Sequence, residues 1–546
     1  MNDKLLEVSN LSIAFGSEED PVKAVDNVSF DVKRGETVVL VGESGSGKSI
    51  SALSILRLLP HAARVTNGKI TLGRTNILSI PERQMRDVRG SRVGMIFQEP
   101  QSSLNPVITI GKQIGEVLQR HKGLKGGAQS KRVVQLLTSV GIPEPERRQN
   151  EYPHQFSGGM KQRVMIAIAM AAEPELLIAD EPTTALDVTV QAQVLDLLKQ
   201  QQAKNDMGIL FITHDLAVAY QMADRIVVMR QGQVVEAGER DSFYRNPQHE
   251  YSKQLFDALP SREKRDREGH SGEIAEHTPV LAVNDLKVHY PIRKGFFKRV
   301  VGHVKAVDGI DLTVYRGSTI AIVGESGSGK TTMGKGILRL LPITSGNVTY
   351  KDADLAKKSA REMRALRSDL QVVFQDPYSS MNPRMMVTDI LQEGMIAQGI
   401  GDNRAEREKR VDELMEQVGL EASFKHRYPH EFSGGQRQRI CIARALAVDP
   451  DVIICDEPTS ALDVSVQAQI LALLRDLQQR LGLTYIFITH NLSVVAYIAH
   501  YIAVMYQGEI VEQGKTDDIL DSPQHPYTQK LLAAIPTIDA TKTDAA

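Results

Sequence analysis

Short apolar runs alternate with helix-like segments along most of the chain. The run in "ETVVLVG" (36–42) precedes the helix-forming stretch "KSISALSILRLLP" (48–60), and the same alternation returns further on. Such runs predict buried strands, and their alternation with helices predicts a mostly parallel sheet covered by helices. Residues from about 107 to 170 and from about 384 to 446 are richer in helical periodicity, which predicts a helical subdomain inserted into each α/β core.

The same series of motifs occurs twice, in the same order and at nearly constant spacing. The pairs are "VGESGSGKS" (41–49) and "VGESGSGKT" (323–331), "FQEPQSSLNP" (97–106) and "FQDPYSSMNP" (374–383), "YPHQFSGGMKQR" (152–163) and "YPHEFSGGQRQR" (428–439), "DEPTTALD" (180–187) and "DEPTSALD" (456–463), and "FITHD" (211–215) and "FITHN" (487–491). Chance cannot supply five ordered matches, so the chain is a tandem duplication.

The duplication predicts a domain at 1–260, a linker at 261–280 and a second domain at 281–546. The linker "SREKRDREGHSGEIAEHTPV" is charged and poor in apolar residues, and we expect it to be flexible and non-helical. The second copy carries extra residues near "PIRKGFFKRVVGHV" (291–304), either a surface loop or a contact site.

Composition excludes several classes of protein. In 546 residues, 65 Lys and Arg face 67 Asp and Glu, so the basic excess of a general nucleic-acid binder is missing. Cys441 and Cys455 stand in apolar runs and predict two buried thiols in a reducing compartment, not a disulfide framework or a metal cluster. The N-terminus lacks an apolar signal core, and no run approaches the roughly 18 apolar residues that span a bilayer. We therefore expect a protein kept in the cytoplasm.

Both glycine-rich loops fit G-x-x-x-x-G-K-[ST], between an apolar strand and a helix expected to end at Pro60 or Pro342. Backbone N–H groups of such loops surround phosphates, the lysine neutralises the β and γ oxygens, and the hydroxyl residue ligates Mg²⁺. The expected phosphate-binding residues are Gly42, Ser44, Gly45, Gly47, Lys48 and Ser49 in the first copy, and Gly324, Ser326, Gly327, Gly329, Lys330 and Thr331 in the second.

Polar residues at the ends of other strands predict which groups bind Mg²⁺ and which act on the attacking water. Carboxyl ends of parallel strands share one edge with the phosphate loop. We expect Asp180 and Asp456 to bind Mg²⁺, Glu181 and Glu457 to polarise or orient the attacking water, and His214 and His490 to lie near the γ-phosphate. Gln98 and Gln375 follow the "MIF" and "VVF" runs and could contact Mg²⁺ or the water while sensing a partner.

A glycine pair at the start of a helix marks a further anion site in each copy. Free N–H groups at Ser157, Gly158 and Gly159, and at Ser433, Gly434 and Gly435, would attract an anion, but no lysine motif lies nearby in sequence. The local sequence therefore leaves the source of that anion open.

Phosphate loop, glutamine loop, "SGG" signature, "DEPT…ALD" and "ITH", in this order, resemble ATP-binding-cassette ATPase domains over essentially the whole chain, twice. The resemblance implies tandem P-loop NTPase domains that dock head to tail, each signature closing over ATP held by the other half. Ser433–Gly435 and Gln436 would then cap ATP at Lys48, and Ser157–Gly159 would cap ATP at Lys330. Asp187 and Asp463 would line the seam, and Phe15 and Tyr290 would stack on adenine, unless these two rings are ordinary core residues.

One departure from the family pattern distinguishes the two copies. The first signature has Met160 where the second has Gln436, and a thioether accepts hydrogen bonds weakly. We expect the site at Lys330 to be somewhat weaker than the site at Lys48. Both sites keep their Lys, Asp, Glu and His, so we expect both to be active.

The tails "NPQHEYSKQLFDALP" (246–260) and "SPQHPYTQKLLAAIP" (522–536) resemble the C-terminal extension of peptide-importer ATPases. The fused chain with "PIRKGFFKR" is most similar to Yej-type ATPases of microcin C and peptide importers, with the fused glutathione importer ATPase as an alternative. This resemblance implies ATP and Mg²⁺ as cofactors, two permease subunits, a periplasmic binding protein and a place on the cytoplasmic face of a bacterial inner membrane. No cysteine follows Cys455, so no iron–sulfur cluster is expected. A soluble ribosome-associated tandem cassette is the rival class, although its long helical linker is missing.

Overall fold

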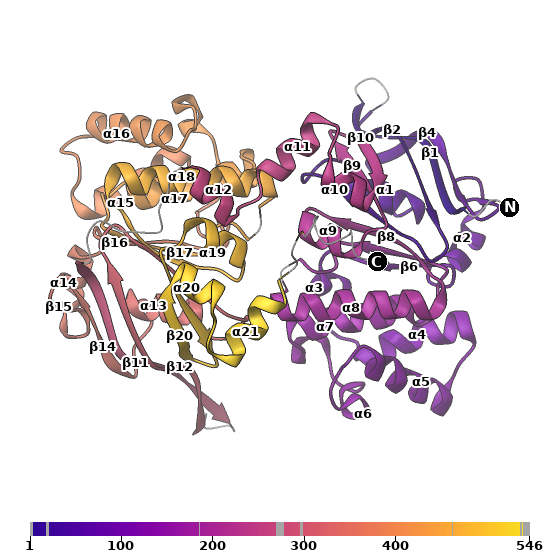
Figure 1. Cartoon of the computed structure of the whole chain (residues 1–546), viewed down its shortest axis with the longest axis horizontal. Coiled ribbons are helices and arrows are strands. Elements are labelled where there is room, and N and C mark those ends of the chain that lie inside the picture. The colour runs from indigo at the N-terminus through magenta and orange to yellow at the C-terminus, as the bar shows by residue number, and fades with distance from the viewer. Residues whose placement is uncertain are drawn as a thin grey trace. The chain divides into compact units, whose positions relative to one another are not determined.

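The computed structural model describes residues 4–17, 21–184, 186–268, 278–294, 299–460, 462–535 and 538. This part of the chain forms two compact units, the first made mainly of residues up to Asp257 and the second mainly of Ala258–Ile535, with Asp187–Thr189 assigned to the second. Figure 1 shows the same kinds of element in each unit: sheets, helices that cover them and a group of helices set apart.

The first unit contains an antiparallel sheet of order β2-β1-β4-β5 and a mainly parallel sheet of order β10-β9-β3-β8-β7-β6, in which only the β10–β9 pair is antiparallel among the described residues. The antiparallel sheet consists of β1 (Lys4–Phe15), β2 (Val22–Lys33), β4 (Ala63–Leu72) and β5 (Thr75–Asn76). The mainly parallel sheet consists of β3 (Thr37–Val41), β6 (Val93–Ile96), β7 (Leu176–Asp180), β8 (Gly208–Thr213), β9 (Arg225–Arg230) and β10 (Gln233–Glu239).

Every residue of β3, β7 and β8 is buried. Strands buried on both faces are apolar without alternation, which explains why their sequences are continuous hydrophobic runs. The mostly parallel core predicted from those runs is therefore confirmed, whereas the separate antiparallel sheet was not anticipated.

Helices follow most of these strands and form the inserted subdomain. Around the sheets lie α1 (Lys48–Ile55), α2 (Glu82–Val88), α8 (Val188–Asn205), α9 (Leu216–Met222), α10 (Arg240–Arg245) and α11 (Glu250–Asp257). Between β6 and β7 come α3 (Pro100–Ser103), α4 (Ile110–Lys122), α5 (Gly126–Ser139), α6 (Pro145–Arg148), the 3-10 turn η1 (Pro153–Gln155) and α7 (Gly158–Met170). Figure 1 shows α4 to α7 grouped together, so the predicted helical insertion is confirmed.

The second unit repeats this plan, with sheets of order β12-β11-β14-β15 and β16-β17-β18-β13-β19-β20. Its strands are β11 (Pro279–Lys294), β12 (Arg299–Tyr315), β13 (Thr319–Val323), β14 (Ser345–Tyr350), β15 (Ala353–Asp354), β16 (Leu370–Val373), β17 (Val452–Asp456), β18 (Thr484–Ile488), β19 (Tyr501–Tyr506) and β20 (Glu509–Lys515). Its helices are α12 (Arg262–Arg267), α13 (Lys330–Ile337), η2 (Leu355–Lys357), α14 (Ala360–Ala365), α15 (Val387–Gln398), α16 (Arg404–Gln417), η3 (Ala422–His426), η4 (Pro429–Glu431), α17 (Gly434–Leu446), α18 (Val464–Leu481), α19 (Leu492–Ile498), α20 (Thr516–Asp521) and α21 (Pro526–Ala533).

The helices after the phosphate loops are shorter than expected. They end at Ile55 and Ile337 and do not reach Pro60 or Pro342. Arg57 and Arg339 adopt φ values of 52° and 49°, and a residue in the left-handed region stops helical hydrogen bonding. Each helix therefore ends before its proline.

The predicted linker is helical in its first part, which corrects the expectation of a non-helical segment. Helix α12 packs on the second unit, where Arg265 is 5% exposed and pairs with Asp517 at 3.1 Å. Glu268 accepts hydrogen bonds from Arg475 and from the Tyr497 hydroxyl, both at 2.8 Å. Arg265 and Glu268 thus pair with other residues of the second unit, whereas Glu263, Asp266 and Arg267 are exposed. Residues 269–277 of the predicted linker lie outside the described residues.

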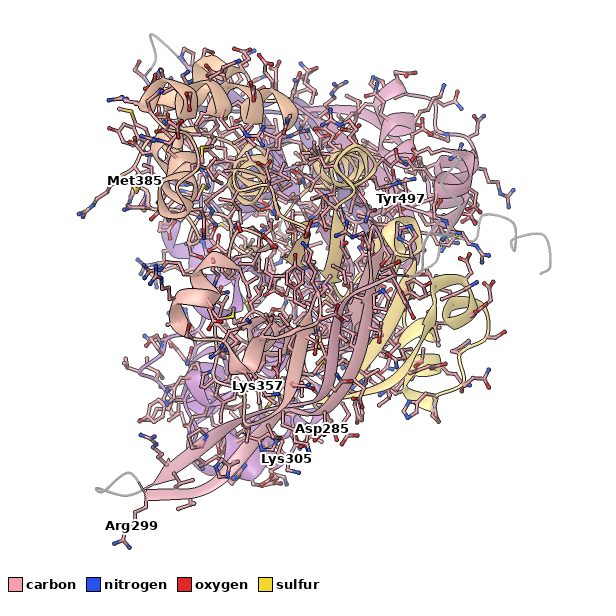
Figure 2. All side chains as sticks on the ribbon, turned by 90° about the vertical axis from the view of Figure 1, so that its left-hand side faces the viewer. Asp285, Arg299, Lys305, Lys357, Met385 and Tyr497 are labelled. Atoms are coloured by element: carbon pink, nitrogen blue, oxygen red, sulfur yellow. The ribbon has the colours of Figure 1, made fainter. Side chains whose placement is uncertain are left out.

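The extra residues near 291–304 lengthen a hairpin. Strands β11 and β12 have 16 and 17 residues, against 12 in each of β1 and β2. Figure 2 shows this ribbon extending beyond the rest of its unit, with Arg299 at the far end and Lys305 nearer the sheet. The segment is therefore an extended ribbon on both sides of residues 295–298, which lie outside the described residues.

Two further expectations concern the thiols and the membrane. Cys441 and Cys455 are both free and buried, as predicted. Among the described residues, no helix combines the length and the apolar character that crossing a bilayer requires.

Candidate functional site

Each phosphate loop joins the end of a buried parallel strand to the start of a helix. The loop needs glycine where it passes other backbone: a Cβ on Gly42 would lie 2.1 Å from the Met229 carbonyl oxygen. Gly47 has φ 96° and begins α1, and a Cβ there would lie 2.7 Å from the Ala24 carbonyl oxygen. The glycines of the motif are thus required by close approach and backbone conformation as well as by any ligand.

The loop lysine is buried inside the turn of the loop. Lys48 is 4% exposed, and its Nζ donates to the carbonyl oxygens of Gly42 and Glu43, both at 2.7 Å. In the second unit Lys330 donates to the corresponding carbonyls of Gly324 and Glu325 at 2.7 and 2.8 Å, and burial lowers its pKa. Carbonyl oxygens are neutral, so anionic phosphate oxygens are the stronger partners for these ammonium groups.

The hydroxyl residue of each loop contacts the strand-end aspartate. Ser49 Oγ donates to Asp180 Oδ1, and Thr331 Oγ1 donates to Asp456 Oδ1, both at 2.9 Å. Burial raises the pKa of Asp180 to about 6, and burial also raises the pKa of Asp456. A buried carboxylate beside a hydroxyl offers oxygen ligands, and burial disfavours its charge, which fits Mg²⁺. When bound there, Mg²⁺ would neutralise charge on the phosphate oxygens.

We expect Asp180→Asn to stabilise the nucleotide-free protein at pH 7.5. The folded-state pKa of about 6 exceeds the ordinary value of 3.8, so the charge at position 180 costs roughly 2 to 3 kcal/mol above pH 6. Asn keeps an oxygen that can accept from Ser49 but carries no charge. Thermal unfolding without nucleotide should show a rise of several °C.

The pH dependence and a control make this prediction specific. Below pH 6 the folded protein protonates Asp180, so the advantage of Asn should shrink as the pH falls. Asp196→Asn, at an exposed position of α8, should not change the unfolding temperature. An Asn variant that is equally or less stable than the parent at pH 7.5 would contradict the electrostatic cost.

Glu181 lies at the centre of a group of hydrogen bonds. Its Oε1 lies 3.1 Å from Nδ1 of His214, and its Oε2 accepts from Gln98 Nε2 and from the Thr184 hydroxyl, both at 2.9 Å. A carboxylate can only accept, so His214 must carry its hydrogen on Nδ1. Glu457 makes the same contacts with His490 at 3.2 Å and Gln375 at 2.8 Å.

The backbone and the pKa of this glutamate are both unusual. Glu181 and Glu457 have φ of 45° and 47°, a strained conformation for a residue with a side chain, and such strain clusters at functional sites. Burial alone would raise the pKa of Glu181, but the hydrogen bond and charge of His214, aided by Thr184 and Lys48, outweigh it and hold the pKa at about 2. Burial would also raise the pKa of Glu457, but the hydrogen bond and charge of His490, aided by Lys330 and Gln375, outweigh it and lower that pKa. The glutamate is therefore ionised at neutral pH and suited to accept a hydrogen bond from water.

The glycine pairs begin the helices α7 and α17. Ser157 and Ser433 cap these helices through their hydroxyl groups. Gly159 and Gly435 face the next helix, because a Cβ there would lie 2.8 Å from Val190 and 2.3 Å from Val466. A Cβ on Gly158 would meet nothing within 4 Å. The second glycine of each pair thus serves packing, and the exposed first glycine leaves helix-terminal N–H groups accessible to an anion.

Gln436 has a role that sequence reasoning missed. Its side-chain oxygen accepts from the Ser433 N–H at 3.0 Å while Ser433 Oγ accepts from the Gln436 N–H at 3.3 Å, which forms a capping box. Met160 cannot complete that box, although Ser157 Oγ still accepts from its N–H at 3.3 Å. The Ser-x-x-Gln spacing at 433–436 is the sequence signal that could have revealed this capping role. The difference between the copies, Met160 in place of the glutamine, therefore affects how the start of the signature helix is capped.

The remaining expected residues are Tyr290, Phe15, Asp187 and Asp463. Tyr290 is 40% exposed on β11, opposite Val304, so it is a surface ring and not a core residue. Phe15 ends β1 with intermediate burial. Asp187 immediately precedes α8, and Asp463 immediately precedes α18.

Two family models each match both halves of the chain. The "ABC transporter" model matches residues 25–184 and 307–460, and the model of the "oligopeptide/dipeptide transporter, C-terminal region" matches residues 235–284 and 511–546. The chain belongs to the ABC transporter family as a protein with two ATP-binding domains. It is an ATPase whose hydrolysis is coupled to transport.

Individual relatives are similar over almost their whole length. The chain is 50% identical to the peptidoglycan transport ATP-binding protein YejF of Agrobacterium fabrum over 99% of this chain and 98% of that protein. It is 46% identical to the glutathione import ATP-binding protein GsiA of Salmonella paratyphi A, and 44% identical to GsiA of Escherichia coli O157:H7, over 98% of this chain and 90% of each relative. The predicted family and fold class are confirmed.

Proposed function

We propose that this chain energises the import of peptides or peptide-containing molecules across a bacterial inner membrane. The observation that carries the proposal is the peptide-transporter C-terminal region in both halves, joined to two complete sets of phosphate-loop and strand-end residues. Names of relatives support it, since glutathione is a tripeptide and peptidoglycan carries peptide chains. Dipeptides, oligopeptides and microcin C-like peptides belong to the same class of cargo.

Within that function, we propose one nucleotide-binding domain in residues 1–260 and another in 281–546, joined by 261–280. Lys48 and Lys330 bind the phosphates. Ser49, Thr331, Asp180 and Asp456 hold Mg²⁺, with Gln98 and Gln375 beside them. Glu181 and Glu457, oriented by His214 and His490, position the attacking water. The strained, ionised glutamates support these roles.

The two halves would share their sites in the head-to-tail manner that the sequence resemblance implies. Ser433–Gly435 would complete the site at Lys48, and Ser157–Gly159 the site at Lys330, with Asp187 and Asp463 at the seam. Phe15 and Tyr290 would stack on adenine. The accessible helix start at Gly158 supports an anion partner for the signature.

The partners that we propose are two permease subunits, which supply the membrane-spanning part, and a periplasmic binding protein, which delivers the cargo. The chain would bind the permeases on the cytoplasmic face of the inner membrane. The specificity for the cargo would reside in those partners. A ribosome-associated role is not favoured, because the relatives named above are transport proteins.

Copurification and growth test the proposed function. The tagged chain, extracted with mild detergent, should bring down two hydrophobic permeases and no ribosomes. A strain that lacks the chain should fail to grow on defined peptides as its nitrogen source, and the Glu181→Gln, Glu457→Gln double variant should not restore growth. Recovery of ribosomes without permeases, or normal peptide growth of the deletion strain, would overturn the proposal.

A further inference from the structure

Each C-terminal tail reaches the phosphate loop of its own unit through one tyrosine. The hydroxyl oxygen of Tyr251, on α11, accepts a hydrogen bond from the Glu43 N–H at 3.2 Å. Tyr527, on α21 (yellow in Figure 1), accepts from the Glu325 N–H at 3.0 Å. The same contact therefore forms independently in both units, between a peptide-transporter tail and the second residue of the G-x-x-x-x-G-K-[ST] motif.

The tyrosine is fixed by the segment that precedes it. In the first unit the Glu236 carboxylate, on β10, accepts from the backbone N–H groups of Gln248 and His249 at 2.8 and 3.0 Å, and His249 Nδ1 accepts from the Tyr251 N–H at 3.1 Å. This is the "PQH" part of the tail. The tail is thus attached to the sheet at one end and to the phosphate loop at the other.

The second unit repeats these attachments with its own residues. Glu512, on β20, accepts from the N–H groups of Gln524 and His525 at 2.7 and 3.1 Å, and His525 Nδ1 accepts from the Tyr527 N–H at 3.2 Å. The ring environments differ between the copies: Arg230 lies over the Tyr251 ring, whereas Tyr506 packs against Tyr527. The shared feature is therefore the hydroxyl contact and not the packing of the ring.

The bonded N–H belongs to the peptide unit whose carbonyl holds the loop lysine. A trans peptide is planar, so its N–H and C=O point in opposite directions. The unit between Gly42 and Glu43 donates its N–H to Tyr251 and accepts from Lys48 Nζ with its carbonyl at 2.7 Å. The unit between Gly324 and Glu325 does the same between Tyr527 and Lys330. Fixing the N–H thus fixes the carbonyl that orients the ammonium group.

We infer that Tyr251 and Tyr527 are positioning residues that hold the phosphate loop, and with it Lys48 and Lys330, in the geometry that binds ATP. This inference rests on the proposed function of the two lysines. The tails are accordingly part of the nucleotide sites and not only a mark of the transporter class. Tyr251 is 2% exposed and Tyr527 8% exposed, so water cannot readily replace the hydroxyl group.

The test measures binding of a fluorescent ATP analogue with Mg²⁺ to the full chain, one site at a time. Lys330→Ala removes binding at the second site, and Tyr251→Phe in that background reports on the first. Tyr527→Phe in a Lys48→Ala background reports on the second. Loss of one buried hydrogen bond should raise the dissociation constant roughly two- to tenfold at each site. In otherwise wild-type chains, KM for ATP should rise while kcat stays within about twofold.

The control separates positioning from general stability. Tyr244→Phe removes a buried hydroxyl of the same unit, which donates to the Leu216 carbonyl and does not contact the phosphate loop. It should leave the ATP dissociation constant unchanged even if it lowers the unfolding temperature. Glu236→Ala, which releases the start of the tail, should reproduce the weaker binding of Tyr251→Phe. Unchanged binding in Tyr251→Phe, or equal weakening in Tyr244→Phe, would overturn the inference.

The Lys48→Ala, Lys330→Ala double variant distinguishes this inference from the proposed function. If that variant binds the analogue normally, the lysine sites themselves are wrongly assigned. If it loses binding while both tyrosine variants bind normally, only the role of the tyrosines is wrong.

Discussion

The Glu181→Gln, Glu457→Gln double variant is expected to lose ATP turnover by at least about a hundredfold and to retain bound ATP. Each glutamate is ionised, held in strained backbone and hydrogen-bonded to a histidine, so its carboxylate is placed to accept a proton or a hydrogen bond from water. A general base typically contributes 10²–10⁴-fold. Gln keeps the shape of the side chain but is not basic, so binding should survive. Phosphate release and retained nucleotide measure the two effects.

The single variants compare the two sites. Met160 cannot complete the capping box that Gln436 forms, so we expect nucleotide retained in the site that the first signature would complete, at Lys330, to be released faster. Glu457→Gln should then trap less nucleotide than Glu181→Gln. Glu146→Gln, at an exposed position of α6, should leave turnover unchanged. Equal trapping by the two single variants would contradict the difference between the sites.

Cysteines at Ser44 and Gly434 should crosslink only when ATP is bound and hydrolysis is blocked by the Glu181→Gln, Glu457→Gln background. Both positions are exposed, whereas Ser46 in the same loop is buried and unsuited to the experiment. If the signature of one half closes over ATP held by the other, these positions approach each other on binding. Mobility shift on a denaturing gel after mild oxidation measures the crosslink, and nearly complete modification is expected with ATP.

A second pair and a control complete this experiment. Ser326 with Gly158 tests the other site and should behave in the same way. Ser44 with Gly158 pairs a phosphate loop with the signature of its own half and should not crosslink. A crosslink in this control pair, or equal crosslinking with and without ATP by the test pairs, would exclude the head-to-tail arrangement.

The sequence alone predicted those strands and site residues whose pattern is local or occurs in both copies. Continuous apolar runs such as those of β7 and β17 identify strands buried on both faces, because a parallel strand covered by helices has no polar side. The carboxyl ends of those strands share an edge with the phosphate loop, so the sequence pattern alone predicts that Asp180 lies beside Ser49. The duplication strengthens each motif, because a chance match would not recur at the same place in both copies.

Other features depend on partners distant in sequence and could not be derived from any local pattern. The charged start of the predicted linker, which was expected to be flexible, is held in place because Asp517 and Arg475, more than 200 residues away, pair with Arg265 and Glu268. By contrast, the capping role of Gln436 could have been predicted, because Ser433 and Gln436 have the three-residue spacing of a capping box.

By itself, the sequence determined the tandem plan, the presence of buried, mostly parallel strands and the chemical groups of each site, since these follow from hydrophobic periodicity and motif spacing. Only the tertiary structure decided that a tail tyrosine meets the phosphate loop and that the glutamate is ionised despite its burial. The physical reason is that both depend on the direction of single hydrogen bonds between segments more than 30 residues apart, and no local pattern encodes that direction.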